Sequence, residues 1–459
     1  RRGDGPHLGG LGSGSGAGVE TSARHRFALA TVWDEVLTVR LLILTPHLLP
    51  DSAPTGEVVS AIVDGLTAEG HDVHVVTSLP WYRNHQIEDD WSGRLVRRGH
   101  YGAATVTRLH PFPTDKGNLA ARAMGFIGLT GLATLVGLAT RGPFDGVVTV
   151  SPPLTFGAAG WLVARRHSCP LVFNVQDVFP DVAVEVGAIR SPLAIRFFRW
   201  MERATYRRAD AVTVLSDDLA TNVVAKLAGP ESGPVVQPVG QLPVRPVVKV
   251  VPNFVDVDAI RPTDRMTEYR REHGLGDRTV VMYAGNLGHS QSLDLVVGAA
   301  DRHRDRPDLV YVINGGGVRA DEMHRAAEAR SNLVVVDYQP RERVSEVLAS
   351  ADLHLVPLRT GLGASSVPSK TYSILAAGRP VVASIDEGSE VARVVGEAGA
   401  GLAVPPDDVD ALVTAVENLV ADPTALAGMG EAGRRWAETW SSPRQVASTY
   451  ADLIAELTR

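Results

Sequence analysis

The sequence TVVMYAGNLGHSQ, residues 279–291, joins an apolar run of strand length to a glycine turn, and a helical pattern begins near Ser292. A strand that turns directly into a helix is the repeating unit of a parallel, doubly wound sheet. Gly285 and Gly288 permit the tight turn, and the helix start presents backbone N–H groups that suit a diphosphate. A plain strand–helix connection has the same pattern, and the dinucleotide signature G-x-G-x-x-G is not present here.

Apolar runs of the same length recur on both sides of this stretch and alternate with helical patterns. The first series covers residues 39–44, 73–77, 146–150, 171–175 and 211–215. The second series covers residues 247–251, 279–283, 309–313, 333–336, 353–356 and 380–384. Two such series predict an α/β protein with two Rossmann-like, doubly wound parallel-sheet domains that face a central cleft.

The length of 459 residues agrees with two domains and additional tails. We expect a disordered N-terminal extension over 1–38, because this region contains a glycine and serine tract and no apolar signal core. The predicted divisions of the rest are a first domain over 39–228, a Pro- and Gly-rich linker over 229–246, a second domain over 247–435 and a C-terminal helix over 436–459 that crosses back to the first domain.

Composition restricts the partners and the compartment. The formal net charge of −7 argues against nucleic acid as a partner, and the single cysteine, Cys169, excludes an intrachain disulfide framework. We therefore expect a cytoplasmic protein. The segment 119–140 approaches the length of a membrane span, but it contains many Gly, Ala and Thr residues. A buried helix of a domain is the favoured interpretation, with a span or an interfacial helix as alternatives.

A second polar segment, GLGASSVPSKTYSILAAGRPVV, covers residues 361–382. It is not a Walker P-loop, because Pro368 and Ser369 precede Lys370 where that motif requires glycine. Proline is tolerated in the first turn of a helix, so we expect a helix to start at Pro368 and to place Ser369 and Lys370 at its N-terminus. Lys370 would add a full positive charge there; the alternative is a solvated surface lysine.

In the first domain, the sequence NVQDVFPD, residues 174–181, follows a predicted strand. Asp177 and Asp181 are candidates for orienting an acceptor hydroxyl or for taking its proton, with helix capping as the alternative. The pairs Asp256/Asp258 and Asp408/Asp410 resemble metal-binding Asp-x-Asp motifs, but both lie in turns, and we interpret them as capping residues. No metal site is predicted.

The segment 191–208, SPLAIRFFRWMERATYRR, combines an apolar stripe with five arginines. A basic amphipathic helix of this kind can lie on an anionic membrane. It can equally be a domain helix with a solvated charged face.

Together, these motifs resemble a known family. The stretches YAGNLG, INGGG, VVDYQPRERVSEVLASADLHLVPL and PSKTYSILAAGRPVV are similar to the donor half of family 4 glycosyltransferases with the GT-B fold. In the N-terminal half, LLILTPHLLPDSAPTGEVV, GHDVHVVTS, NVQDVFPD and VPNFVD resemble the branch that adds N-acetylated hexosamines, such as N-acetylfucosamine, to bacterial surface polysaccharides. The resemblance runs from about Val39 to near the C-terminus.

The resemblance implies roles for particular residues. Many members have Glu at the positions of Ser365 and Ser373 and use the latter to hold the ribose, so Ser373 or Glu390 is the expected ribose contact here. Lys370 matches a diphosphate-binding position of the family and is the first expected catalytic residue, and Asp177, from its place after the strand, is the second. The implied acceptor-side residues are Gly56, which lets phosphate and acceptor approach, and Asp181. The implied donor-binding residues are Gly285, Asn286, Leu287, Gly288, Gln291, Gly315, Gly316, Ser369, Lys370, Ser373 and Glu390.

The implied activity is transfer of an N-acetylated hexosamine from a UDP-sugar to a saccharide, with retention of configuration and with no metal or other cofactor. The resemblance further implies a polyprenyl-diphosphate-linked acceptor and peripheral association with the inner face of the plasma membrane. Two alternatives remain at this point. One is a UDP-N-acetylhexosamine epimerase of the same architecture, and the other is a catalytically idle nucleotide-binding homologue.

Overall fold

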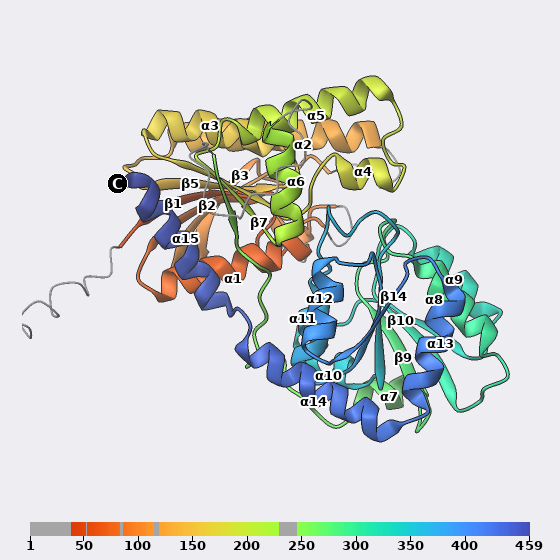
Figure 1. Cartoon of the computed structure of the whole chain (residues 1–459). Helices are drawn as coiled ribbons and strands as arrows, with labels where there is room; N and C mark the ends of the chain where they lie inside the picture. The colour runs from red at the N-terminus through yellow and green to blue at the C-terminus, as the bar shows by residue number, and fades with distance from the viewer. Residues whose placement is uncertain (1–37, 52, 83–85, 114–118, 229–245) are drawn as a thin grey trace, which may run out of the picture. The chain divides into compact units, whose positions relative to one another are not determined.

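The computed structural model describes residues 38–51, 53–82, 86–113, 119–228 and 246–459 (Figure 1). The N-terminal extension predicted over 1–38 and the linker predicted over 229–246 fall almost wholly outside these ranges. The described residues form two separate β-sheets, each covered by helices.

The first sheet has eight strands in the order β3-β4-β2-β1-β5-β6-β7-β8. Its strands are β1 (Arg40–Leu44), β2 (Asp72–Ser78), β3 (Val96–Tyr101), β4 (Ala104–Leu109), β5 (Gly146–Ser151), β6 (Leu171–Val175), β7 (Ala211–Val214) and β8 (Val247–Val250). The helices of this part are α1 (Pro54–Ala68), η1 (Asp89–Trp91), α2 (Leu119–Ala139), α3 (Thr155–His167), α4 (Asp181–Glu185), α5 (Pro192–Tyr206) and α6 (Asp217–Ala228).

Helices cover both faces of this sheet. Alternate residues of β1 point to opposite sides, so Leu42 and Leu44 pack in the cluster that includes α2 and α3, whereas Leu41 and Ile43 pack with α1 and α15 (Pro443–Thr458). Burial on both faces explains why these strands are almost continuously apolar in the sequence. The segment predicted over 119–140 forms α2, with Leu129 buried in this core. Among the described helices, none is long and apolar enough to cross a membrane.

The second sheet has six parallel strands in the order β11-β10-β9-β12-β13-β14. Its strands are β9 (Thr279–Ala284), β10 (Leu309–Asn314), β11 (Leu333–Val336), β12 (Leu353–Pro357), β13 (Val381–Ser384) and β14 (Gly401–Val404). The helices of this part are α7 (Glu268–Glu272), α8 (Leu293–Arg302), α9 (Ala320–Glu328), η2 (Arg341–Arg343), α10 (Val344–Ala349), α11 (Lys370–Ala376), α12 (Glu390–Glu397), α13 (Val409–Val420) and α14 (Pro423–Thr439).

The predicted fold class, with two doubly wound α/β domains, is confirmed, but two details of the prediction were wrong. The run 247–251 does not open the second sheet; it forms β8, which pairs in parallel with β7 of the first sheet. The first sheet is also not wholly parallel, because β3 pairs antiparallel with β4 at its edge. Neither of these two strands was predicted, since their polar, arginine-containing sequences lack a continuous apolar run.

The chain returns to the first sheet at its C-terminal end. Helix α14 packs on α11, whereas α15 packs on α1. Tyr450 of α15 is buried, and its hydroxyl lies 2.6 Å from Asn174 Nδ2 and 3.2 Å from Thr213 Oγ1. The return therefore falls between α14 and α15, close to Ser442, which caps α15, and not at residue 436 as predicted.

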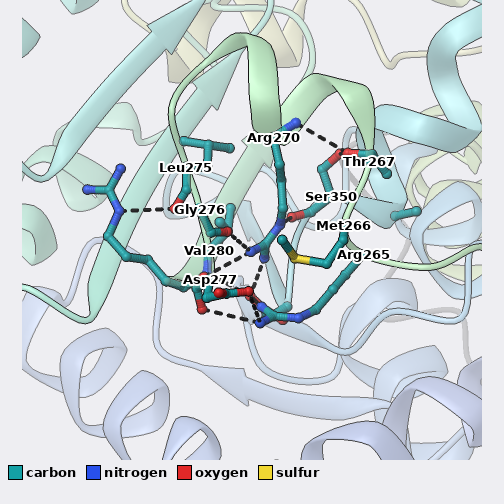
Figure 2. A network of polar contacts seen from close by, with 12 residues as sticks. Arg265, Met266, Thr267, Arg270, Leu275, Gly276, Asp277, Val280 and Ser350 are labelled. Atoms are coloured by element: carbon teal, nitrogen blue, oxygen red, sulfur yellow. Dashed lines mark hydrogen bonds and ion pairs between the residues drawn. The ribbon is translucent and has the colours of Figure 1, made fainter.

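A buried arginine, Arg270, lies at the end of the second sheet where the strands β9 and β12 begin (Figure 2). Arg270 is 1% exposed and donates hydrogen bonds to the Ser350 carbonyl oxygen at 2.8 Å and to Asp352 Oδ2 at 2.6 Å. Asp352 also accepts hydrogen bonds from Arg265 at 2.9 Å and from the Val280 amide at 2.8 Å. These contacts join the starts of the two central strands, β9 and β12. The carboxyl ends of the same strands lie at the opposite end of the sheet.

Candidate functional site

The second sheet has a switch point between β9 and β12. Strands β10 and β11 extend the sheet on one side of β9, and β13 and β14 extend it on the far side of β12. Open α/β sheets bind their ligands beyond the carboxyl ends of the strands at such a point. The turn 285–288 follows β9, and the connection 358–369 follows β12 and leads into α11. The glycine turn and the Lys370 segment, both predicted from the sequence, therefore follow two adjacent strands at the switch point.

Two glycine turns lie against each other at these strand ends. The Gly285 amide donates to the Asn314 carbonyl oxygen at 2.7 Å, and the Leu287 amide donates to that of Gly316 at 2.8 Å. Gly285 has φ 150° and Gly315 has φ 152°, and a Cβ atom on Gly315 would lie 1.8 Å from the Gly285 oxygen. Only glycine fits so close an approach of two backbones. The structure thus brings together the predicted donor-binding segments 285–288 and 315–316.

Lys370 lies directly beside the first of these turns. A Cβ atom on Gly285 would lie 1.7 Å from Lys370 Cε, so the lysine stem fills the space that a side chain there would need. The amine donates a hydrogen bond to the Tyr283 hydroxyl at 3.0 Å, and that hydroxyl donates to the Asn286 carbonyl oxygen at 2.6 Å. Tyr283 was not predicted from the sequence as a site residue, although it lies one residue before the end of β9 and strand ends of this kind line the ligand site.

The charge of Lys370 is not balanced by a neighbouring acid. Burial lowers the pKa of Lys370 to about 8, and within the described ranges no carboxylate forms an ion pair with it. Lys370 is partly buried, and a cation withdrawn from water without a counter-charge is costly; a bound anion removes that cost. The alternative of a solvated surface lysine does not describe this side chain.

The connection that precedes Lys370 is held by two aspartates. Asp386 Oδ2 accepts the amides of Gly361 at 3.0 Å and Gly363 at 2.9 Å. Asp407 Oδ2 accepts the amide of Thr360 at 3.0 Å. Helix α11 begins at Lys370 rather than at Pro368, and the Thr371 amide bonds back to the Pro368 carbonyl oxygen at 3.2 Å.

The other predicted donor-binding residues differ in their surroundings. Gln291 Oε1 accepts the Gly288 amide at 3.1 Å, so this side chain closes the turn itself. Ser369 is exposed just before α11, and Ser373 is partly buried within that helix. Glu390 begins α12 and forms a 2.6 Å ion pair with Arg393. In the described structure, Glu390 forms no hydrogen bond or ion pair with Ser373 or Lys370, so these three residues do not make one connected group.

On the first sheet, Gly56 lies in the first turn of α1 and is buried. A Cβ atom there would lie 2.9 Å from the Asp51 oxygen and 3.1 Å from His47 Cβ. The small residue is therefore required for the packing of α1 on the loop that follows β1. The role that the resemblance implies for Gly56 stays a prediction.

Asp177 lies where the first sheet meets the connection that leads to Lys370. It forms an isolated antiparallel bridge with Ser366, and the Val178 amide donates to the Ser365 carbonyl oxygen at 2.9 Å. Burial raises the pKa of Asp177, and a hydrogen bond with Ser366 opposes this shift. The carboxyl group therefore retains a proton more readily than an ordinary aspartate, which suits hydrogen bonding to a hydroxyl.

Asp181, the second predicted acceptor-side residue, is occupied by an ion pair. Its Oδ2 atom lies 2.7 Å from Lys226 Nζ, and the same amine lies 2.6 Å from the buried Glu202. Asn222 Nδ2 also approaches Asp181, at 3.4 Å. The structure therefore shows the Asp181 carboxylate bound within the first domain and does not bring it to Lys370.

The two Asp-x-Asp pairs have the predicted local roles. Asp408 caps α13 by accepting the Ala411 amide at 2.9 Å, and Asp256 accepts the amides of Asp258 at 3.0 Å and Ala259 at 2.9 Å. Across the described ranges, no group of three or more His, Cys, Asp or Glu side chains is placed to hold a metal ion.

Comparison with known families agrees with this geometry. The chain matches a glycosyl transferase 4-like domain over residues 55–240 and a domain of glycosyl transferases group 1 over residues 265–436. Together the two matches cover well over half of the chain, one for each sheet. This chain therefore belongs to the family 4 glycosyltransferases and has the GT-B fold.

Similar proteins include a putative colanic acid biosynthesis glycosyl transferase, WcaI, of Escherichia coli K12. It is 24% identical over 82% of this chain and 91% of its own length. A GDP-mannose-dependent phosphatidylinositol monomannoside mannosyltransferase of Mycolicibacterium smegmatis is 34% identical over 41% of this chain and 52% of its own length. Sucrose-phosphate synthase of Thermosynechococcus elongatus shares the fold, with a TM-score of 0.68 at 17% identity over 91% of this chain and 99% of that one.

Proposed function

We propose that this protein transfers a sugar, an N-acetylated hexosamine, from a UDP-sugar to a saccharide acceptor in surface polysaccharide biosynthesis, with retention of configuration. The observation that carries the proposal is the uncompensated Lys370 amine at the Gly285 turn. The similarity to a putative colanic acid biosynthesis glycosyl transferase supports the polysaccharide context. Structures of Anabaena HepE with UDP-glucose share the fold, with a TM-score of 0.65 at 13% identity over 91% of this chain and 100% of that one.

In this proposal the chemistry is mainly electrostatic. The bond between the anomeric carbon and the diphosphate oxygen breaks, and the bond between that carbon and the acceptor oxygen forms on the same face. Negative charge grows on the leaving diphosphate, where Lys370 and the backbone N–H groups of the glycine turns stabilise it. The acceptor proton passes to a leaving phosphate oxygen. Asp177 orients the acceptor hydroxyl, and no metal ion takes part.

The acceptor is proposed to be a saccharide linked to polyprenyl diphosphate at the inner face of the plasma membrane, with the enzyme in the cytoplasm. Such an acceptor presents its reacting hydroxyl close to a bilayer, so peripheral association of the enzyme with the membrane would bring the two together.

The central test is Lys370→Ala. We expect turnover to fall about 100-fold or more, because removal of one preorganised charge-stabilising donor has effects of this size. Lys249→Ala, which changes a partly exposed lysine paired with Glu456 at 3.8 Å, is the control and should retain activity. Near-normal turnover of Lys370→Ala would rule out the assigned role.

The donor is tested with UDP-N-acetylglucosamine, UDP-N-acetylgalactosamine, UDP-glucose and GDP-mannose, first by thermal shift and then by product formation. We expect the UDP-linked N-acetylhexosamines to raise the melting temperature and to be consumed only with acceptor. Use of GDP-mannose alone would overturn the proposed donor. Formation of an epimer without acceptor would instead establish an epimerase, and binding without any transfer would indicate an idle homologue.

A further inference from the structure

Helix α5 exposes large apolar side chains on its outer side, in addition to those that it turns toward the protein, such as Phe198 and Met201. The side turned into the protein contains Glu202, Thr205 and Tyr206, all buried. The side turned to solvent exposes Leu193 by 80%, Phe197 by 53% and Trp200 by 58%. A helix at the surface of a soluble domain normally buries its apolar stripe and exposes its polar residues.

The inward position of Glu202 is held by specific contacts of one carboxylate oxygen, Oε1. The buried Glu202 carboxylate accepts hydrogen bonds from Tyr206 at 2.9 Å and from Lys226 at 2.6 Å. These contacts determine which side of the helix faces the protein. The outward position of the three apolar side chains therefore follows from the packing of the domain.

The apolar surface continues onto the neighbouring helices. Met124, Ile127 and Leu135 of α2 are each more than half exposed and fall on one stripe of that helix. Helix α3 packs against both α2 and α5 and exposes Leu162. All three helices lie on the same side of the first sheet (Figure 1). We call this surface, formed by the outward sides of α2, α3 and α5, the α2–α3–α5 face.

Positive charge accompanies the apolar side chains. Arg196, Arg199, Arg203 and Arg207 lie on or directly after α5, and in the described structure none of them forms an ion pair. Glu202, the only acidic residue of α5, is buried and already paired with Lys226. The local excess is notable because the whole chain has a net charge of −7.

We propose that the α2–α3–α5 face docks onto an anionic lipid bilayer. The apolar side chains of α2 and α5 enter the boundary between headgroups and acyl chains, and the arginines bind lipid phosphates. A tryptophan in such a position is typical of membrane interfaces, where one part of the ring is apolar and the other is wet. Charge favours this occupant over a second copy packed symmetrically through the same face, because such a contact would place the arginines of α5 against one another. The inference identifies the surface behind the proposed membrane association and does not depend on the transfer reaction.

The test is co-sedimentation of the full chain with phosphatidylcholine vesicles, with and without phosphatidylglycerol. We expect binding only to the anionic vesicles, and weaker binding as salt rises to about 0.15 M. Phe197→Ser/Trp200→Ser should lower the partition coefficient about tenfold or more. Arg196→Gln/Arg199→Gln should lower it about fivefold for each arginine removed.

The matched control is Met266→Ser/Leu402→Ser, which removes two exposed apolar side chains from the second domain and should bind vesicles like the unchanged protein. All variants should keep the melting temperature and the turnover of a soluble saccharide acceptor, which separates membrane docking from the proposed reaction. Absence of binding to anionic vesicles would overturn the proposal. A concentration-dependent dimer that Phe197→Ser/Trp200→Ser abolishes, without vesicle binding, would assign the face to a second copy and would also overturn it.

Discussion

The amine of Lys370 has a hydroxyl partner, Tyr283, but no acidic partner in the described part of the chain. Its pKa is lowered to about 8 by burial, so the amine changes charge within the range in which enzymes are assayed. A bound diphosphate would supply the missing counter-charge and raise that pKa. Donor binding and protonation of Lys370 are therefore linked.

We expect the affinity for a UDP-sugar to be constant below about pH 8 and to fall above it by up to about tenfold per pH unit. The sign follows because the empty site loses its proton near pH 8, whereas the occupied site keeps it, so binding above that pH must take up a proton. Calorimetric titration from about pH 7 to about pH 9 measures the effect. Lys370→Arg is the control and should show a flat profile, because arginine stays charged throughout. A flat profile in the unchanged protein as well would show that donor binding is not linked to the protonation of Lys370.

A second prediction concerns Gly285. Gly285→Ala would place a methyl group 1.7 Å from the present position of Lys370 Cε, so the lysine must leave the turn. We expect the dissociation constant for UDP to rise about tenfold or more, because charge-assisted contacts of this kind contribute roughly 1.5–3 kcal/mol. Gly428→Ala is the control, since a Cβ atom there meets nothing within 4 Å. Unchanged UDP binding by Gly285→Ala would show that Lys370 does not need its present position.

At the scale of elements, the two ends of the central strands of the second sheet contribute differently: one end forms the candidate site and the other stabilises the fold. The carboxyl ends of β9 and β12 lead into the glycine turn and the Lys370 connection. The opposite ends are joined by the ion pair between Arg270 and Asp352 at 2.6 Å; Figure 2 shows Arg270 among its neighbours. Substitutions where β9 and β12 begin should therefore change the free energy of unfolding much more than the affinity for the donor.

Arg270→Met tests this division. It leaves Asp352 partly buried with Arg265 as its remaining charged partner, and we expect the free energy of unfolding to fall by about 3–5 kcal/mol. Arg271→Met, on the same short helix but with an exposed side chain paired to Glu268, should change it by less than about 0.5 kcal/mol. Urea unfolding measures both. If the folded Arg270→Met variant lost affinity for UDP, the starts of β9 and β12 would also contribute to donor binding, and this prediction would be wrong.

The elements that could be predicted from sequence were those buried on both faces, such as β6, β10 and β12, because burial requires a continuous apolar run. The edge strand β3 was missed because its exposed side chains are mostly polar, and the buried β4 beside it was missed because Thr105, Thr107 and Arg108 interrupt its apolar run. Strand β8 was detected but assigned to the wrong sheet, because an apolar run does not identify its pairing partner. Pairing depends on contacts far apart in the chain.

At the scale of the whole molecule, the final helix connects distant parts of the sequence. Tyr450 of α15 contacts Asn174, 276 residues earlier, and Thr213, 237 residues earlier. Helix α15 also covers α1, where a Cβ atom on Gly65 would lie 2.6 Å from Ala447 Cβ. The first sheet is therefore complete only when the end of the chain has packed on it.

Tyr450→Phe should lower the free energy of unfolding by about 1–3 kcal/mol, because the change leaves buried polar groups with fewer partners. Asp452→Ala, at an exposed position of the same helix, should have an effect below about 0.5 kcal/mol. Chemical denaturation followed by circular dichroism gives both values. Equal stability of the two variants would show that the hydroxyl contacts contribute nothing to the attachment of α15.

The sequence alone determined the class of fold and the two segments of the candidate donor site, because strand-length apolar runs, glycine turns and a proline before Lys370 are local patterns. Only the tertiary structure decided that the Lys370 amine donates a hydrogen bond to the hydroxyl of Tyr283, 87 residues away. It also decided that Glu390 forms an ion pair with Arg393. The structure also decided which side of α5 faces outward, since the buried pairing of Glu202 with Lys226 sets the rotation of that helix. These outcomes depend on side chains that meet only after the sheets have formed, and no local pattern contains that information.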